Sequence, residues 1–178
     1  MEILSELLPG CFLVGSDCFD DHRGSFVKTF HSYRFSEFNF SFEIREEYYT
    51  TSAKGVIRGM HFQVPPSDHQ KIVYCISGWV KDVLLDLRKG PGYGKVCFVD
   101  LRADLHNLIL IPKGIAHGFL SKTQNSTMVY KTSTVHDPKN DRGILWNSFG
   151  FDWDVTESPI FSIRDSSHPR FEDFISPF

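Results

Sequence analysis

The sequence predicts an all-β domain, built as an antiparallel sandwich or barrel with short helices at its periphery. Short segments rich in β-branched or aromatic residues recur at regular spacing, each closed by Gly, Pro, Asp or Asn: residues 71–78, 79–87, 95–101, 107–112 and 126–132. Such spacing within residues 43–132 favours antiparallel pairing over units of alternating strand and helix. Helix patterns are weak and confined to residues 32–39 and 170–175. No repeat or linker divides the chain, so we expect one domain spanning residues 1–178.

Net charge and hydropathy limit the partners and the compartment. The formal charge is −3 at pH 7, which favours neither nucleic acid nor an anionic membrane as partner. The N-terminal residues do not form a secretion signal, and no apolar run approaches the ~18 residues that span a bilayer. The four cysteines form no CxxC pair, and Cys75 and Cys97 lie in apolar runs, so we expect thiols rather than disulfides. These features predict a cytoplasmic protein.

Phenylalanine is unusually frequent, with 17 copies. Four of them crowd one N-terminal segment: Phe35, Phe38, Phe40 and Phe42. This is more than one turn or strand normally buries. Core packing is the first explanation, and a subunit interface is the second. The sequence leaves both open.

Two motifs and the lysine between them indicate the chemistry. Residues 58–63 read RGMHFQ, Lys71 follows eight residues later, and the motif PKGIAH ends at His117. This spacing traces a metal-binding cupin, a jellyroll barrel whose ligands are usually a His-x-His pair, a Glu and a later His. Here Gln63 replaces the second His and Lys71 replaces the Glu, so an ammonium occupies the place of an anionic ligand. We expect no metal and no cofactor, but a pocket with a base, a cation and a second histidine.

Strand alternation predicts which side chains share the barrel interior. His61 and Gln63 share one face of their strand, and Arg58 lies at its start on the opposite side. Alternation also groups residues of later strands, Lys71 with Val73, Asp82 with Leu84 and Asp86, and Met128 with Tyr130. If the faces agree, one small ligand meets His61, Lys71, Asp82, His117 and Tyr130. Each residue alone would pass for an ordinary strand residue, but their coincidence at this spacing favours a site.

Further stretches accompany the two motifs and carry a family resemblance. They are DHRGSF (21–26), KGVIRGMHFQVPP (54–66), QKIVYCISGWVKDVLLDLRKG (70–90), LILIPKGIAHGFL (108–120), VYKT (129–132) and RGILWN (142–147), with Asp152-Trp153 and Arg164-Asp165. From about residue 8 to residue 175 the chain resembles the nucleotide-sugar epimerases typified by dTDP-4-dehydrorhamnose 3,5-epimerase. The resemblance implies a cupin jellyroll that needs no metal or cofactor. It also implies an epimerase acting at C3, with C5 open, on a nucleotide-linked 4-keto-6-deoxyhexose for surface polysaccharide such as lipopolysaccharide O antigen.

The resemblance assigns catalytic roles to four residues. His61 matches the base, Asp165 the carboxylate paired with it, Tyr130 the acid on the other ring face, and Lys71 the cation beside the C4 carbonyl. The chemistry is consistent, because a proton next to a ketone is weakly acidic and its loss places charge on the carbonyl oxygen. An ammonium stabilises that charge, and histidine titrates near neutrality.

The resemblance also implies a binding set and a homodimer. Arg58 and Arg23 match diphosphate contacts, which suits the planar fork of arginine. Arg23 and Phe26 belong to an N-terminal segment that reaches the neighbouring subunit's site. Gln63 and His117 complete the predicted contacts to the nucleotide sugar.

Three positions depart from the family pattern. Lys28 stands where the family usually has Glu, Glu46-Glu47-Tyr48 replaces Gln-x-Asn, and His136 replaces a second tyrosine. By the family's arrangement they lie at the nucleotide end of the ligand, so Lys28 and His136 join the predicted substrate-binding residues. We infer as a hypothesis that the nucleotide differs from dTDP, with CDP as the candidate.

Three other functions remain open at this point. One is a metal-dependent cupin enzyme with an incomplete ligand set. Another is a nucleotide-sugar 3,4-ketoisomerase, which shares the barrel but typically uses a pair of histidines. The last is a catalytically silent sugar-binding module, which is hard to reconcile with the presence of His61, Lys71, Tyr130 and Asp165 together.

Overall fold

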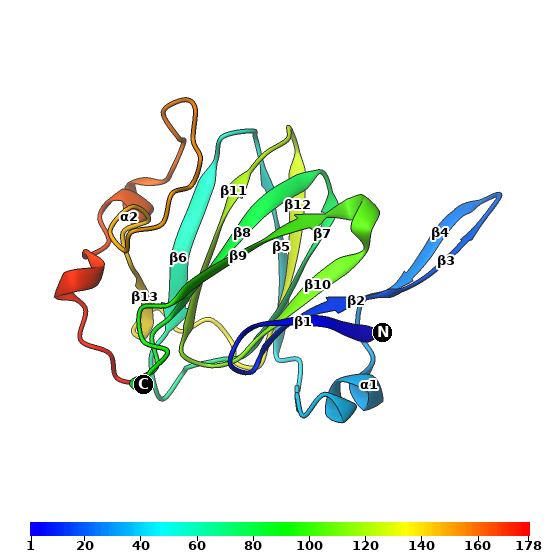
Figure 1. The fold of residues 1–178 in the computed structure, drawn as a ribbon, viewed down its shortest axis with the longest axis horizontal. Helices are drawn as coiled ribbons and strands as arrows, with labels where there is room; N and C mark the ends of the chain where they lie inside the picture. Colours follow the sequence, from blue (N-terminus) through cyan, green and yellow to red (C-terminus); the bar gives the residue numbers. More distant parts are fainter.

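Two antiparallel sheets face each other and form a barrel in the computed structural model, which describes residues 1–178 (Figure 1). One sheet has the order β1-β2-β10-β7-β12-β5 and the other β13-β6-β11-β8-β9, while β3 and β4 form a separate hairpin. The strands of the first sheet are β1 (Glu2–Leu8), β2 (Cys11–Gly15), β10 (Asn107–Ile111), β7 (Lys71–Ser77), β12 (Ser126–Thr132) and β5 (Glu46–Ser52). Those of the second are β13 (Asp141–Gly143), β6 (Ile57–Gln63), β11 (Ile115–Ser121), β8 (Trp79–Asp86) and β9 (Val96–Arg102). The predicted all-β cupin jellyroll is confirmed.

Helices are few and short, as predicted. They are α1 (Ser32–Glu37), α2 (Ile163–Ser166) and the 3-10 turns η1 (Ala103–Leu105) and η2 (Phe171–Asp173). The helix expected at residues 32–39 is present as α1. The one expected at residues 170–175 is only the single turn η2, because so short a segment cannot repay helix nucleation. None of these helices is long and apolar enough to cross a membrane.

All five strands predicted by residue range are present, as β7, β8, β9, β10 and β12. The strands before residue 43 were not predicted. Most of β1 is exposed, so its side chains lack the alternation that marks a half-buried strand. The hairpin of β3 (Asp17–Asp21) and β4 (Gly24–Lys28) is also mostly exposed and projects away from the barrel (Figure 1).

The barrel interior is packed by side chains from both sheets, including Val73, Leu84, Met128 and Tyr130. These residues confirm the predicted inward faces of β7, β8 and β12, since Ile72, Val83 and Val129 pack on the outer faces instead. All four cysteines are free thiols. Lys71 therefore enters the interior on the same face as Val73.

The aromatic-rich segments cover the outer faces of the two sheets. Phe35 and Phe40 are buried against the six-stranded sheet, with Phe38 and Phe42 packed beside them. Trp153 is buried against the five-stranded sheet, together with several phenylalanines of the C-terminal segment. Core packing therefore explains the N-terminal phenylalanines, and each buried ring contributes on the order of 2 kcal/mol.

The register of β6 corrects one prediction. Ile57, Met60 and Phe62 all lie on its outer face, although strict alternation would separate the first two. The ladder with β11 shifts register here, because Gly59 (φ +130°) passes so close to Gly118 that a Cβ would clash with it. Arg58 therefore shares the inward face of His61 rather than lying opposite.

Candidate active site

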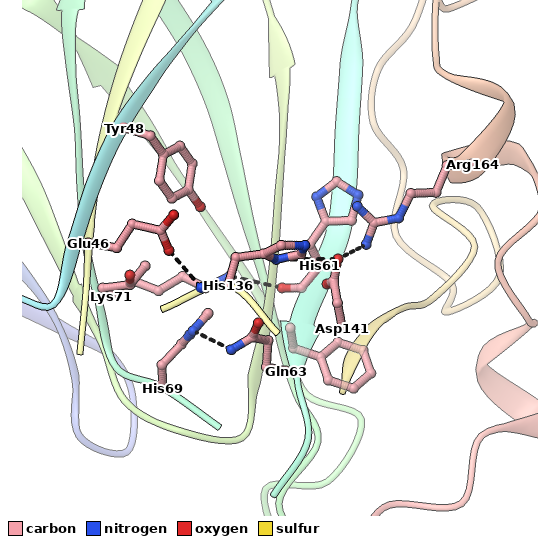
Figure 2. A pocket seen from close by; sticks show the side chains of 11 residues that line it. Glu46, Tyr48, His61, Gln63, His69, Lys71, His136, Asp141 and Arg164 are labelled. Carbon is pink, nitrogen blue, oxygen red and sulfur yellow. Dashed lines mark hydrogen bonds and ion pairs between the residues drawn. The ribbon is translucent and has the colours of Figure 1, made fainter. Parts of the chain in front are cut away.

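A polar cavity of about 350 Å³ opens between the two sheets (Figure 2). This volume lies within the range of small-molecule sites in proteins. Only two of its eleven lining residues are hydrophobic. The lining consists of Glu46, Tyr48, His61, Phe62, Gln63, His69, Lys71, Thr132, His136, Asp141 and Arg164. Figure 2 shows these side chains converging from both walls.

His61 and Asp165 form a close pair at the edge of this cavity. His61 Nε2 lies 2.6 Å from Asp165 Oδ1, and 31% of the His61 side chain is exposed. An ionised carboxylate can only accept, so Nε2 carries the hydrogen and Nδ1 is left as the basic nitrogen. Burial lowers the pKa of His61 and outweighs the opposing effect of Asp165. His61 is therefore a neutral imidazole at neutral pH and can accept a proton.

Local structure keeps Asp165 ionised and oriented. It lies in the first turn of α2, where its backbone N–H donates to the N-cap Ser162 Oγ at 3.0 Å. Burial alone would raise the pKa of Asp165, but the neighbouring His168 and His61 side chains outweigh it and lower the pKa. The Gly59 N–H also approaches its carboxylate at 3.4 Å. Asp165 is thus positioned to stabilise an imidazolium at His61.

Lys71 brings an ammonium into the same cavity. Its Nζ donates to the His61 carbonyl oxygen at 3.1 Å, and the residue is only 5% exposed. An ammonium has three donors, and no carboxylate lies within ion-pair distance, so two donors are free for a ligand. Burial lowers the pKa of Lys71 to about 8, against the opposing influence of Asp141 and Asp82. Lys71 is therefore a cation placed next to the base.

His117 and Asp82 form a second pair that is sealed from the cavity. His117 Nε2 lies 2.7 Å from Asp82 Oδ2, with side-chain exposures of 4% and 0%. Burial raises the pKa of Asp82, and His117 partly compensates. The structure brings His117 beside His61, its direct cross-strand partner, but His117 does not line the cavity.

Tyr130 is also covered. It does not line the cavity, and its hydroxyl lies 3.5 Å from Thr50 Oγ1. Tyr48 stacks on its ring at a centroid distance of 4.8 Å and an interplanar angle of 12°. Tyr48, its cross-strand partner, lines the cavity beside it.

Two of the three departures from the family pattern enter the same cavity as the base. Glu46 and His136 line it together, and the His136 N–H donates to Glu46 Oε2 at 2.7 Å. Tyr48 also lines it. Cross-strand pairing places Tyr48 directly beside Tyr130.

Gln63 lines the cavity, but its side-chain amide forms hydrogen bonds with the surrounding loops. Its Nε2 donates to the Ser67 carbonyl oxygen at 2.7 Å, and its Oε1 accepts from the Asp137 N–H at 2.6 Å. Arg58 lies outside the cavity lining and donates to Ser52 Oγ at 3.0 Å. Their roles in substrate binding remain predictions.

Arg23, Phe26 and Lys28 lie on the projecting hairpin rather than at this cavity (Figure 1). Arg23 pairs with Asp21 of the same turn, and Phe26 is 61% exposed. The hairpin of this chain takes no part in its own cavity.

Sequence reasoning did not name Asp141 and Arg164, which line the cavity, or His168, which lies beside Asp165, as site residues. Alternation within EEYYTTS would have placed Glu46 and Tyr48 on one inward face. His168 has no such signal, because it follows α2 in a loop. His61, Asp165 and His168 are also close enough to share a metal ion, with donor atoms within 4.8 Å of one another.

Comparison with known proteins decides the family. A family model described as dTDP-4-dehydrorhamnose 3,5-epimerase matches residues 5–173. The chain belongs to this family.

Individual relatives agree over nearly their whole length. The dTDP-4-dehydrorhamnose 3,5-epimerase of Shigella flexneri is 34% identical over 177 residues, covering 97% of each chain. The crystal structure of the Bacillus anthracis dTDP-4-dehydrorhamnose 3,5-epimerase, with TDP and PPi bound, is 30% identical with a TM-score of 0.91, covering 95% of this chain and 98% of that one. A 3'-monoepimerase from Streptomyces bikiniensis, in complex with dTDP-quinovose, is 26% identical with a TM-score of 0.88, covering 96% and 87%. As a member of this epimerase family, the chain is an enzyme of the isomerase class.

Proposed function

We propose that this enzyme inverts C3 of a nucleotide-linked 4-keto-6-deoxyhexose through an enolate. The observation that supports this most is the contact between Lys71 Nζ and the carbonyl oxygen of His61, which places a base and a cation in one cavity. A base alone would suit many reactions. A base beside an uncompensated ammonium suits removal of a proton next to a carbonyl group.

The first step is proton removal from C3 by His61 Nδ1. The C–H electron pair moves into the ring, the C3–C4 double bond forms, and the negative charge moves to the C4 oxygen. Lys71 donates to that oxygen, and Asp165 stabilises the imidazolium formed at His61. A donor on the opposite ring face then returns a proton to C3, and the C4 carbonyl reforms with inverted C3. Tyr130 is the donor that the sequence predicts.

Two details of this proposal are the identity of the nucleotide and whether C5 is inverted as well as C3. Several relatives are named for dTDP sugars, so the dTDP-linked substrate is the first to test. The CDP-linked sugar is the alternative, because Glu46 and His136 alter one side of the cavity. One relative is named a 3'-monoepimerase and others 3,5-epimerases, so exchange at C5 is measured beside C3.

A homodimer would complete the site. The exposed β3–β4 hairpin carries Arg23 and Phe26 away from its own barrel, where they can reach a neighbouring cavity. The exposed guanidinium of Arg23 suits a diphosphate, and the exposed ring of Phe26 suits a nucleobase. The four free thiols are compatible with a reducing compartment, which supports a location in the cytoplasm. The role proposed for the product is to supply deoxysugars for surface polysaccharide.

The test is incubation with dTDP- and CDP-linked 4-keto-6-deoxyhexoses in deuterated buffer, followed by NMR. We expect deuterium at C3 of the inverted product. Its absence with both substrates would contradict the proposed function. Conversion to a 3-keto product would instead identify a ketoisomerase, and loss of activity on metal removal would identify a metal-dependent enzyme at His61, Asp165 and His168.

Saturation-transfer NMR with dTDP, CDP, UDP and GDP identifies the nucleotide. Tight, selective binding of dTDP would exclude CDP, and selective binding of CDP would support the altered residues as specificity determinants.

A further inference from the structure

Two histidines direct their Nε2 atoms at the same carboxylate oxygen. His61 Nε2 lies 2.6 Å from Asp165 Oδ1, and His168 Nε2 lies 3.5 Å from that atom. The donor atoms of the three residues all lie within 4.8 Å of one another. Asp165 and His168 are three residues apart, within and just after α2, a spacing that turns two side chains to the same side of a helical turn.

The Nε2 atom of His168 is buried and has no hydrogen-bond partner. Only 10% of the side chain is exposed. The ring lies against β13, where a Cβ at Gly143 would overlap with it, and it meets the His61 ring edge to face at a centroid distance of 5.6 Å. Since an unpartnered polar atom in a protein interior is costly, a ligand that binds this nitrogen is favoured.

Two imidazoles and one carboxylate are a donor set that suits Zn²⁺. Zinc binds such donors at about 2.0–2.2 Å, which places tetrahedral neighbours about 3.3 Å apart. The contact between His168 and Asp165 fits this spacing, and the contact between His61 and Asp165 has to widen from 2.6 Å. The positive charges of Lys71 and Arg164 act on His61 and oppose a cation, so we expect binding to be reversible.

We propose that Zn²⁺ binds His61, Asp165 and His168 and reversibly inhibits the enzyme by blocking its base. The inhibition rests on the proposed function, whereas the binding does not. Zn²⁺ takes the lone pair of His61 Nε2, and the hydrogen from that atom moves through solvent to Nδ1. A neutral imidazole carries one N–H, so Nδ1 then has no lone pair with which to accept the C3 proton. No proton is released overall.

The binding experiment titrates Zn²⁺ into the metal-free chain, without a histidine tag and without substrate. Calorimetry measures affinity and stoichiometry, and thermal unfolding measures the rise in melting temperature that a bound ion produces. We expect one ion per chain. Mg²⁺ is the control metal, because it prefers oxygen donors and should not bind here.

The variants His168→Ala and His168→Gln test the ligand that has no other partner. Loss of a residue that only supports a ligand typically weakens metal binding by about 10–100-fold, so loss of a ligand should weaken it at least as much. The matched control is His106→Asn. His106 lies outside the cavity lining, and asparagine tolerates its positive φ of 48°. This control should keep the affinity for Zn²⁺.

The inhibition experiment follows deuterium entry at C3, with the free Zn²⁺ concentration fixed by a metal buffer because the substrate diphosphate also binds metal. We expect saturating Zn²⁺ to stop exchange, and EDTA to restore it. The concentration of Zn²⁺ that halves the rate should rise in both His168 variants by the same factor as the dissociation constant.

Three results would overturn this inference. Equal affinity for Zn²⁺ in the unmodified chain and both His168 variants would place the ion elsewhere. Normal exchange with the site saturated would show that the base is not blocked, and loss of exchange after EDTA would show that the metal is required. If the metal-free enzyme introduced no deuterium at C3, the proposed function would fail, while the binding titrations would still test the site.

Discussion

Two His–Asp pairs lie side by side in this barrel and differ above all in their access to the cavity. His61–Asp165 and His117–Asp82 have contact distances of 2.6 and 2.7 Å, and the two histidines are direct cross-strand partners. The side chain of His61 is 31% exposed, whereas that of His117 is 4% exposed. Hydrogen-bond geometry is therefore the same in both pairs, and access to the cavity separates them.

The comparison teaches what makes a histidine a base in this fold. The sealed pair joins two strands of the five-stranded sheet, β8 and β11, and no ligand can reach its nitrogen atoms without moving the core. The open pair joins the barrel to α2 and lies beside the Lys71 ammonium. A proton taken by His61 thus has an exit, and the negative charge it leaves on the substrate has the Lys71 ammonium nearby, whereas His117 has neither.

The largest effect should follow loss of the open base. In His61→Asn we expect epimerisation to fall by about 10²–10⁴, because a general base contributes roughly that factor. The melting temperature should change little, since His61 is partly exposed. Steady-state kinetics and thermal unfolding measure the two effects, and near-normal turnover would show that another group is the base.

Loss of the sealed partner should act mainly on stability. His117→Ala leaves the Asp82 carboxylate buried without its partner, which typically costs about 3–5 kcal/mol. For a chain of this size that corresponds to a melting temperature lower by roughly 6–20 °C. Differential scanning calorimetry measures it, and an unchanged melting temperature would mean that the pair contributes no net stability.

Much of this arrangement could be predicted from the sequence, because strand alternation is a local property. It placed Lys71 and Tyr130 on inward faces, and the structure confirms both. Alternation failed at Arg58, where Gly59 and Gly118 pass so closely that the register shifts. That contact joins strands far apart in the sequence.

The other features that sequence-based prediction missed also depend on contacts between strands far apart in the sequence. Sequence gave no reason to separate His117 from His61, because burial of one and exposure of the other depend on how the sheets close. Nor did it place Tyr48 beside Tyr130, since this follows from pairing between β5 and β12. The catalytic and binding roles remain predictions, and the experiments described here test them.

The pH dependence sharpens the role of the open pair. Activity needs neutral His61, whose pKa lies below 6.5, and protonated Lys71, whose pKa is about 8. We expect kcat/KM to rise with pH on an acidic limb below 6.5, remain level, and fall on an alkaline limb near 8.

Lys71→Arg is the control, because arginine stays protonated throughout this range. Its residual activity should lack the alkaline limb. An alkaline limb that persisted near pH 8 in this variant would assign it to a group other than Lys71.

The smallest effect should come from His168. This residue shares the Asp165 carboxylate with His61, at 3.5 Å. In His168→Ala the carboxylate interacts more strongly with His61, so the pKa of His61 rises and the acidic limb moves to higher pH. The pH profile of kcat/KM measures this shift, and a shift to lower pH would contradict it.

The most direct test of the central claim is deuterium entry at C3 catalysed by His61→Asn and His117→Asn in parallel, at a temperature where both variants are folded. If access rather than geometry makes the base, His61→Asn loses exchange and folded His117→Asn exchanges far faster. Equal loss in both variants, or exchange that depends on His117 alone, would contradict the account.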